Sequence, residues 1–463
     1  MQNHEITADI AGETAVPENK MGTMPMPKLL LTMSLPAICS MMLQAVYNIV
    51  DSFFVSRISE DAMAAVTLVF PVQMLIIAAG VGTGVGLNSL ISRRLGAKRF
   101  ADADSAATHG FLLVLVNWAV FFLFGFFCSR PFYTWYADDN IGLVDMATSY
   151  GTIVLCFSCF IFMQTTCEKI LQATGKMVIP MVSNMIGCVV NIVLDPLMIF
   201  GLFGCPAMGV TGAAAATIIG QCVGMSVILV CFFKTKCDVH VSFRNFQFSM
   251  KTIKEIYTVA LPGMIMQAIP SFVNMFLNMI LIGFSVTAVS VLGVYFRLQS
   301  FIFMPTFGLT QGAMPIMGYN YGARNRKRLM SATVLCLISA AVIMVFGLIV
   351  FQTCPHQLMA MFDAGEEMMN MGVSAMRLLS LCFIPAAVGI TFSTFFQALG
   401  HGIYSLFMTL IRQCIGIMPA AWVFSKMWGV TGVWISFPVA EFFGLIVAIL
   451  FFVIVYKKEI KTM

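Results

Sequence analysis

Apolar runs of about twenty residues follow one another along almost the whole chain, and they constrain its fold more than any other feature. A helix of about twenty apolar residues crosses the hydrocarbon core of a bilayer, where only helices and closed barrels satisfy the backbone. The sequence therefore predicts an all-α integral membrane protein with about twelve transmembrane helices. We expect the spans near residues 29–55, 62–91, 107–130, 147–167, 177–203, 209–233, 256–283, 288–317, 331–353, 371–396, 403–425 and 431–456.

Charge is scarce in this chain, because Asp, Glu, Lys and Arg make up only 10% of its 463 residues. Soluble domains carry about 25% of such residues, so no soluble domain of any size fits between the spans. We therefore attribute the net charge of +5 to the orientation of the spans in the membrane and not to nucleic-acid binding. The lipid bilayer is the expected partner.

The basic residues gather on one side of the expected spans. Twenty of the 26 Lys and Arg residues lie between even and odd spans or at the two termini. The loops on the other side contain only Arg57, Arg130 and Lys426, together with several acids. Because cytoplasmic loops are enriched in Lys and Arg, we expect both termini in the cytoplasm.

Several short sequence motifs of the first half of the chain, called words below, recur in the same order in the second half. Such an ordered series predicts two homologous six-helix lobes, which enter the membrane from the same side because six is even. Transporters built from parallel repeats bind their substrates near the midplane between the repeats. The repeated words are Leu35-Pro36 and Leu261-Pro262, Gly96-Ala97-Lys98 and Gly322-Ala323-Arg324, Gln172-Ala173-Thr174-Gly175 and Gln397-Ala398-Leu399-Gly400, and Gly209-Val210-Thr211-Gly212 and Gly429-Val430-Thr431-Gly432.

This repeat divides the chain into lobes, a linker and tails. The first residues are polar and lack a cationic start followed by an apolar core, so we do not expect a cleaved signal peptide. The expected parts are a disordered cytoplasmic tail at 1–27, an N-terminal lobe at 28–233, a cytoplasmic linker at 234–255, a C-terminal lobe at 256–456 and a cytoplasmic tail at 457–463.

Few acids interrupt the apolar runs, and three of them are Asp51, Asp195 and Glu441. An ionisable residue inside the membrane is costly and marks a functional site by default. Asn191 and Asp195 are four residues apart, hence on one helical face, and Pro196 weakens the backbone ladder beside them. The alternatives are that Asp51 is hydrated near a helix end and that Asn191 and Asp195 only bridge helices.

The first and fifth expected spans both run outward from the cytoplasm. Counted from their cytoplasmic ends at about 1.5 Å per residue, Asp51 and Asp195 both lie in the outer half of the membrane. Two carboxylates that meet in a low dielectric cannot both ionise easily. Such a site can bind a proton, or Na⁺ with Asn and Thr oxygens completing its shell. Pro36, about four turns below Asp51, makes the first span bendable. Our hypothesis is that protonation of Asp51 shifts this bend, and the alternative is a static kink.

Two further acids have less certain surroundings. Glu441 could attract a cationic drug or form an ion pair with Arg297 or Arg412 inside the C-terminal lobe, and we favour the ion pair. Glu168 is expected at the membrane interface beside Lys169, with a role in drug or proton binding as the alternative.

No motif indicates a metal, a cofactor or ATP. The fourteen Cys and five His residues do not cluster, and no Walker motif is present. Gly80, Gly82, Gly84 and Gly86 lie inside an expected span, where small residues allow close helix packing. The 37 Met and 42 Phe residues suit promiscuous apolar binding surfaces, but no single one is predicted to contact a drug.

The duplicated layout and the paired words resemble the multidrug and toxic compound extrusion (MATE) family over residues 28–456. The strings Tyr47-Asn48-Ile49-Val50-Asp51 and Tyr319-Asn320-Tyr321-Gly322-Ala323-Arg324 are most similar to its MepA-like bacterial branch. The resemblance implies a monomeric antiporter of the bacterial plasma membrane. It would export bulky, often cationic and amphipathic drugs through a central cleft in exchange for H⁺ or Na⁺.

The resemblance also implies an ion site in the N-terminal lobe. The matching residues are Asp51, Asn191, Asp195 and Thr217, with Thr211 as the competing choice for the last. Some family members place carboxylates on the seventh and tenth helices, where this chain has none, so we do not expect a second cation site there.

Two other classes of function remain as alternatives. A flippase for lipid-linked sugars would be expected to line its cleft with several cationic side chains, and only Arg297, Arg377 and Arg412 are available. An integral-membrane enzyme would need clustered His, Asp-rich or nucleophile motifs at a membrane face, and the sequence offers none.

Overall fold

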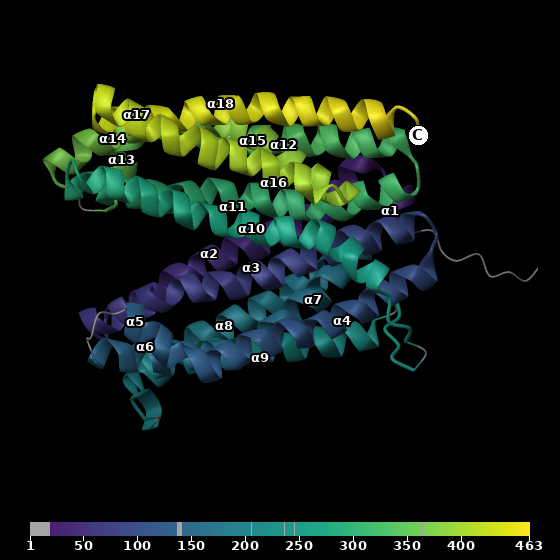
Figure 1. The fold of residues 1–463 in the computed structure, drawn as a ribbon, viewed down its shortest axis with the longest axis horizontal. Helices are drawn as coiled ribbons and strands as arrows, with labels where there is room; N and C mark the ends of the chain where they lie inside the picture. The colour runs from purple at the N-terminus through teal and green to yellow at the C-terminus, as the bar shows by residue number, and fades with distance from the viewer. Residues whose placement is uncertain (1–18, 137–140, 205, 236, 245, 363) are drawn as a thin grey trace, which may run out of the picture.

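A computed structural model describes residues 19–463 except 137–140, 205, 236, 245 and 363, and this part of the chain consists of helices joined by short loops (Figure 1). The helices of the first half are α2 (Met26–Ser56), α3 (Glu60–Gly96), α4 (Phe100–Leu123), η1 (Phe124–Cys128), α5 (Ser129–Tyr136), α6 (Ile141–Cys156), α7 (Cys159–Ala173), α8 (Val178–Phe200) and α9 (Gly209–Lys234). Those of the second half are α10 (Met250–Ile282), α11 (Val286–Gly322), α12 (Arg326–Thr353), α13 (Pro355–Ala360), α14 (Glu366–Ser380), α15 (Phe383–Leu399), α16 (Gly402–Leu410), η3 (Ile411–Ile417), α17 (Met418–Trp428) and α18 (Val430–Val455).

The helices account for the twelve predicted spans. Ten helical segments are long and apolar enough to cross a membrane. The other two spans are bent pairs, α6 with α7 at 41° and α14 with α15 at 47°. The prediction of an all-α membrane protein with about twelve spans is therefore confirmed.

The sequence repeat is reproduced in the local geometry of the two halves. Helices α3 and α11 each contain 37 residues. Ser59 caps the first by accepting from the amide of Ala62, and Ser285 caps the second by accepting from Ala288. Each helix is followed by a basic residue in the left-handed region, Lys98 with φ 57° and Arg324 with φ 53°.

The first helix of each half crosses over to pack against the second helix of the other half. A side chain at Gly308 or Gly312 of α11 would collide with α2 at Ile38 or Ser34, and the Ser34 hydroxyl donates to the Leu309 carbonyl at 3.0 Å. In the same way, α10 packs closely against α3. The halves are therefore joined by a reciprocal exchange of helices that the repeat alone does not predict.

The four alternating glycines of α3 serve two different neighbours. A Cβ at Gly80 or Gly84 would meet α7 of the same half, whereas a Cβ at Gly82 or Gly86 would meet the α10 backbone. The expectation that these glycines allow close helix packing is confirmed. Helix α3 thus lies pressed between its own half and the other one.

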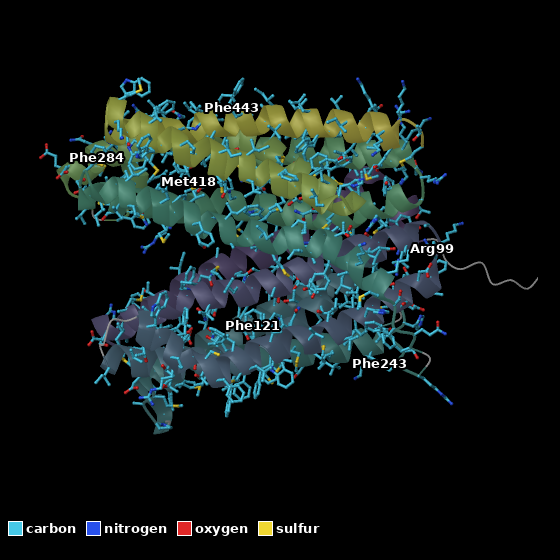
Figure 2. All side chains as sticks on the ribbon, viewed as in Figure 1. Arg99, Phe121, Phe243, Phe284, Met418 and Phe443 are labelled. Carbon is cyan, nitrogen blue, oxygen red and sulfur yellow. The ribbon has the colours of Figure 1, made fainter. Side chains whose placement is uncertain are left out.

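The halves meet most closely at the end of the bundle that carries Lys98, Arg99, Lys176 and Arg324, which we call the basic end. In Figure 1 this end holds α1 and the C-terminus, and the two groups of helices diverge away from it. Arg99 marks this end in Figure 2 and Phe284 marks the opposite end.

Three kinds of contact close the basic end. Gly96 and Gly322 lie against the Tyr319 and Arg93 carbonyls of the other half, with no room for a Cβ. The Ser89 hydroxyl donates to the Gln397 carbonyl at 2.6 Å. Arg94 and Glu255 form an ion pair at 2.9 Å.

The expected tails are partly ordered. Residues 1–18 lie outside the described residues, but residues 19–27 contain helix α1 (Lys20–Thr23) and the start of α2. Asn19 donates to the Thr174 carbonyl at 3.3 Å, and Arg328 donates to the Met24 carbonyl at 2.7 Å, so this segment bridges the halves. At the other terminus, η4 (Tyr456–Ile460) continues α18, and Glu459 contacts His401 at 2.9 Å. The inter-lobe linker is shorter than expected, because α9 ends at Lys234 and α10 begins at Met250.

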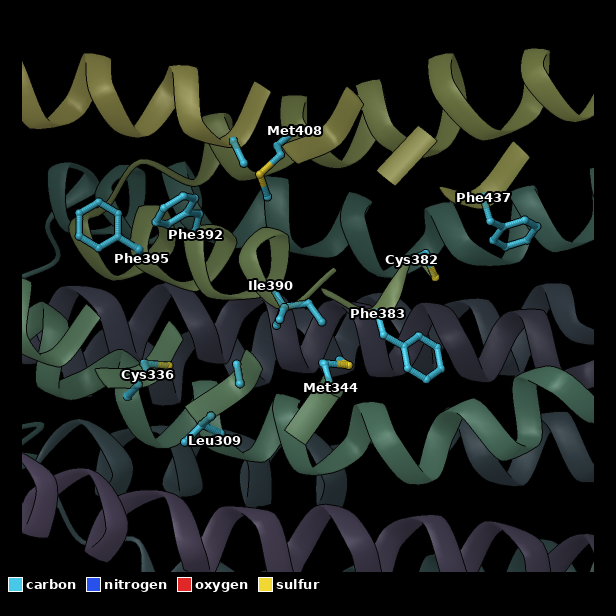
Figure 3. Close-up of a cluster of buried hydrophobic side chains, with 14 of the residues drawn as sticks. Leu309, Cys336, Met344, Cys382, Phe383, Ile390, Phe392, Phe395, Met408 and Phe437 are labelled. Atoms are coloured by element: carbon cyan, nitrogen blue, oxygen red, sulfur yellow. The ribbon is translucent and has the colours of Figure 1, made fainter. Parts of the chain in front are cut away.

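The second half has an apolar core. Figure 3 shows aromatic and sulfur-containing side chains gathered between its helices, including Cys336, Met344 and Phe383. The ring centroids of Phe351 and Phe383 are 5.2 Å apart, a separation typical of favourable aromatic pairs. The first half has apolar clusters of its own, and one of them includes Tyr150 of α6 and Phe162 of α7.

Candidate functional site

A cavity of about 520 Å³ lies within the first half. Its walls come from α2, α3, α6, α7, α8 and α9, and Gln311 of α11 is a lining residue from the second half. The α2 part of the wall runs from Ala37 to Asp51, which corresponds to roughly 20 Å of helix. The cavity is therefore elongated along the bundle axis.

The four predicted ion-site residues come together at the end of the cavity away from the basic end. Asp51, Asn191 and Thr217 line the cavity, and Asp195 is fully buried one turn beyond Asn191. The Asn191 amide donates to the Thr217 hydroxyl at 3.4 Å. Thr211 lies at the start of α9, almost two turns away from Thr217. The structure thus favours Thr217 over Thr211 as the fourth member.

Several oxygen atoms of this cluster are buried without a partner. Among the described residues, neither carboxylate oxygen of Asp195 has a hydrogen-bond partner, and the same holds for Oδ1 of Asn191. The carboxyl groups of Asp51 and Asp195 are close enough to interact electrostatically. A buried carboxylate without partners is costly, so a proton or a bound cation would stabilise this arrangement.

Two tyrosines complete the cluster, and the sequence did not single them out. Tyr47 lies one turn before Asp51 on α2 and lines the same cavity as Asp51 and Thr217. Tyr150 of α6 accepts a hydrogen bond from Gln73 at 3.1 Å and also interacts electrostatically with Asp51. The spacing of four residues between Tyr47 and Asp51 could have indicated a shared face. Nothing in the sequence connects α6 with this site.

Glu168 is part of the cavity wall, and its expected place at the membrane interface stays a prediction. Only 16% of its side chain is exposed. Its carboxylate accepts hydrogen bonds from Gln172 at 2.7 Å and from Asn184 at 3.3 Å. Helix α7 turns its last polar residues toward the cavity, and the period of four in Gln164, Glu168 and Gln172 could have indicated this face.

Glu441 forms the favoured ion pair inside the second half. Its oxygens lie 3.1 and 3.4 Å from Nη1 of Arg412. Arg297 is not its partner, because the Arg297 side chain is exposed on α11. Arg297 lies on the same face of α11 as Gly308, which is about three turns further along and packs against α2.

Pro36 is buried within an unbroken α2, beside the contact with α11. Its role as a bend stays a prediction.

Removing one member of the Glu441–Arg412 pair is expected to destabilise the protein. The two side chains are 11% and 19% exposed, and breaking a buried pair costs about 3–5 kcal/mol because one charge is left uncompensated. Thermal unfolding in detergent should therefore show a large loss of stability for Arg412→Met. The double variant Arg412→Met/Glu441→Leu should recover most of it. Equal losses in both variants would contradict a buried ion pair.

Two six-span halves, the first of which holds a cavity, form an architecture that is typical of membrane transporters built from parallel repeats. The model of the MatE family matches residues 36–197 and 262–422, once in each half. The chain therefore belongs to the MatE family, as the resemblance predicted.

The chain is similar to curated and solved members over nearly its whole length. The multidrug export protein MepA of Staphylococcus aureus (strain MSSA476) is 25% identical over 434 residues, which cover 90% of this chain and 91% of the relative. A structure described as the outward-facing conformation of a multidrug resistance MATE family transporter superposes with a TM-score of 0.90 at 27% identity, covering 97% of this chain and 100% of the other. A transporter of the MOP superfamily from Pyrococcus furiosus gives a TM-score of 0.89 at 27% identity, covering 96% of this chain and 100% of the other.

Proposed function

We propose that this protein exports drugs from a bacterial cell in exchange for H⁺ or Na⁺, and that Asp51, Asn191, Asp195 and Thr217 bind the coupling ion. The observation that carries the proposal is the buried carboxylate of Asp195, beside the cavity, for which the described part of the chain provides no hydrogen-bond partner. The multidrug export activity named for the MepA relatives supports drugs as substrates. The cavity size suits bulky amphipathic molecules, and pockets of about 300–1,000 Å³ bind drug-sized ligands.

In this proposal the basic end faces the cytoplasm, because cytoplasmic loops are enriched in Lys and Arg. Both termini are then cytoplasmic, and the protein works as a monomer in the plasma membrane. The contacts between the halves at the basic end correspond to a transporter closed toward the cytoplasm. Transport proceeds by alternating access, in which one half rocks against the other.

Ion binding and drug binding compete in this scheme. A proton or Na⁺ arriving from outside neutralises the acidic cluster, and this favours release of a cationic drug to the outside. Drug binding from the cytoplasm requires the acids to be free again. Lys169 is the one cation among the described lining residues, which does not favour a flippase for lipid-linked sugars.

Transport in everted membrane vesicles tests the coupling. A pH gradient and a Na⁺ gradient are imposed separately, and accumulation of a fluorescent cationic drug is recorded. We expect accumulation to rise several-fold with one of the two gradients and to collapse when that gradient is dissipated. Vesicles without the protein provide the control. Accumulation that ignores both gradients would contradict antiport.

A further inference from the structure

The basic-end part of the cavity holds a buried lysine that bridges the two halves. Lys169 of α7 lines the cavity and is only 4% exposed. Its ammonium donates to Oε1 of Gln172 at 3.1 Å and to Oε1 of Gln311 at 2.9 Å. Because Gln311 belongs to α11, the second of these hydrogen bonds connects the first half to the second half.

The one carboxylate that the described residues place close to the Lys169 ammonium, that of Glu168, forms only a long ion pair with it. The nearest oxygen of Glu168 is 3.8 Å away, and both oxygens of Glu168 already accept from the amides of Gln172 and Asn184. The two close acceptors of Lys169 are neutral amide oxygens. Charge-assisted hydrogen bonds between two ions are roughly twice as strong as neutral ones, so an anionic acceptor would bind this ammonium better than either amide does.

The chain makes space for this lysine, and only in one half. A Cβ at Gly84 of α3 would lie 2.6 Å from Cγ of Lys169, so the absence of a side chain there lets the lysine stem pass toward α11. At the matching position of the second half the repeat places Thr394, and Ser393 stands where the first half has Glu168. The charged pair is therefore a feature of the cavity and not of the shared fold.

The cavity consequently has two ends of different character. Asp51 and Asp195 make one end acidic, and Lys169 supplies a cation toward the other end. Its partner Gln311 contacts Met41 of α2, which lies ten residues, or roughly 15 Å of helix, before Asp51. We propose that Lys169 binds an anionic group, such as a carboxylate or sulfonate, on an amphipathic substrate whose cationic part points toward the acidic end. The inference rests on the proposed function and adds the class of substrate.

The anionic group takes the place of Gln311 on the ammonium. Gln311 then loses its hydrogen bond to the first half, and one of the contacts between the halves near the basic end is released when substrate is bound. Substrate recognition and loosening of the closed end are in this way linked through one side chain.

The test uses two forms of one dye, a rhodamine with a free benzoate carboxylate and the methyl ester of the same rhodamine. Binding of both is measured by fluorescence polarisation on purified full-length protein in phosphatidylcholine nanodiscs, which contain no anionic lipid. The quantity of interest is the ratio of the two affinities. This ratio does not respond to a general loss of folded protein.

Lys169→Met is expected to lower the preference for the acid over the ester by about tenfold or more, since hydrogen bonds to charged groups contribute about 1.5–3 kcal/mol. Lys169→Arg should restore most of the preference. Gln311→Ala should act in the opposite direction and tighten binding of the acid several-fold, because the competing acceptor is gone. Lys327→Met, which removes an exposed lysine at the basic end, is the control.

Two results would contradict the proposal. One is an unchanged affinity ratio in Lys169→Met, and the other is weaker binding of the acid in both Lys169→Met and Gln311→Ala. Either result would show that Lys169 only connects the two halves and does not bind substrate. Failure of the proposed function looks different. In that case neither gradient drives dye transport by the unaltered protein, whatever the affinity ratio is.

Discussion

Asp195→Asn is expected to abolish gradient-driven efflux, down to the level of cells without the transporter, while the folded protein becomes as stable as before or more stable. The substitution keeps the size of the side chain and removes the charge. It takes away a buried carboxylate whose oxygens have no partner among the described residues, and burying such a charge is costly. The measurement pairs drug efflux with thermal unfolding of the purified protein.

The two readouts separate an ion site from a structural role. If Asp195 only joined helices, its replacement would lower stability as well as efflux. Asp51→Asn should likewise abolish coupled efflux with normal expression, because its carboxylate is the other charge of the site. Asp61→Asn removes an exposed acid of the same half and should retain efflux. Full activity of Asp51→Asn would leave that residue as part of the packing.

Gly96→Val is expected to reduce transport at least about tenfold by preventing closure of the basic end. A Cβ at Gly96 would overlap the Tyr319 carbonyl, and the repeat-related Gly322 faces the Arg93 carbonyl in the same way. Overpacking costs about 1–3 kcal/mol even where side chains can adjust, and backbone atoms adjust less. A shift of this size moves a two-state equilibrium strongly toward the open form.

Hydrogen–deuterium exchange can detect the shift directly. Amides near residues 93–99 and 319–324 should exchange faster in Gly96→Val, because this contact no longer protects them. Gly293→Val is the matched control, since nothing lies within 4 Å of a Cβ at Gly293 of α11. Unchanged exchange and unchanged transport in Gly96→Val would contradict the assignment of Gly96 to the closing contact.

Features that the sequence determines locally could be predicted from it. Span positions follow from apolar runs, and the two halves follow from motifs repeated in order at a nearly constant offset. The cap residues Ser59 and Ser285 and the left-handed Lys98 and Arg324 show how closely that offset fixes local geometry. The acidic cluster could be predicted as well, because carboxylates inside apolar runs are rare.

Features that depend on neighbours in space could not be predicted. Thr211 and Thr217 lie on one helix, and Thr217 is distinguished by its hydrogen bond to Asn191 and its place in the cavity wall. The sequence names Lys169 only as the neighbour of Glu168, whereas the contact of its side chain with Gly84 of α3 depends on how α3 and α7 pack. The exchange of α2 and α10 is likewise invisible in the sequence, because either arrangement buries the same apolar faces.

The exchange of first helices has a consequence for how the protein is made. The basic-end part of α2 packs against α11, which is synthesised more than two hundred residues after it. Until then, Ser34 and its neighbours face lipid or a chaperone, and the first half cannot reach its final form. A truncated chain that ends after α9 would therefore be a recognisable target for membrane quality control.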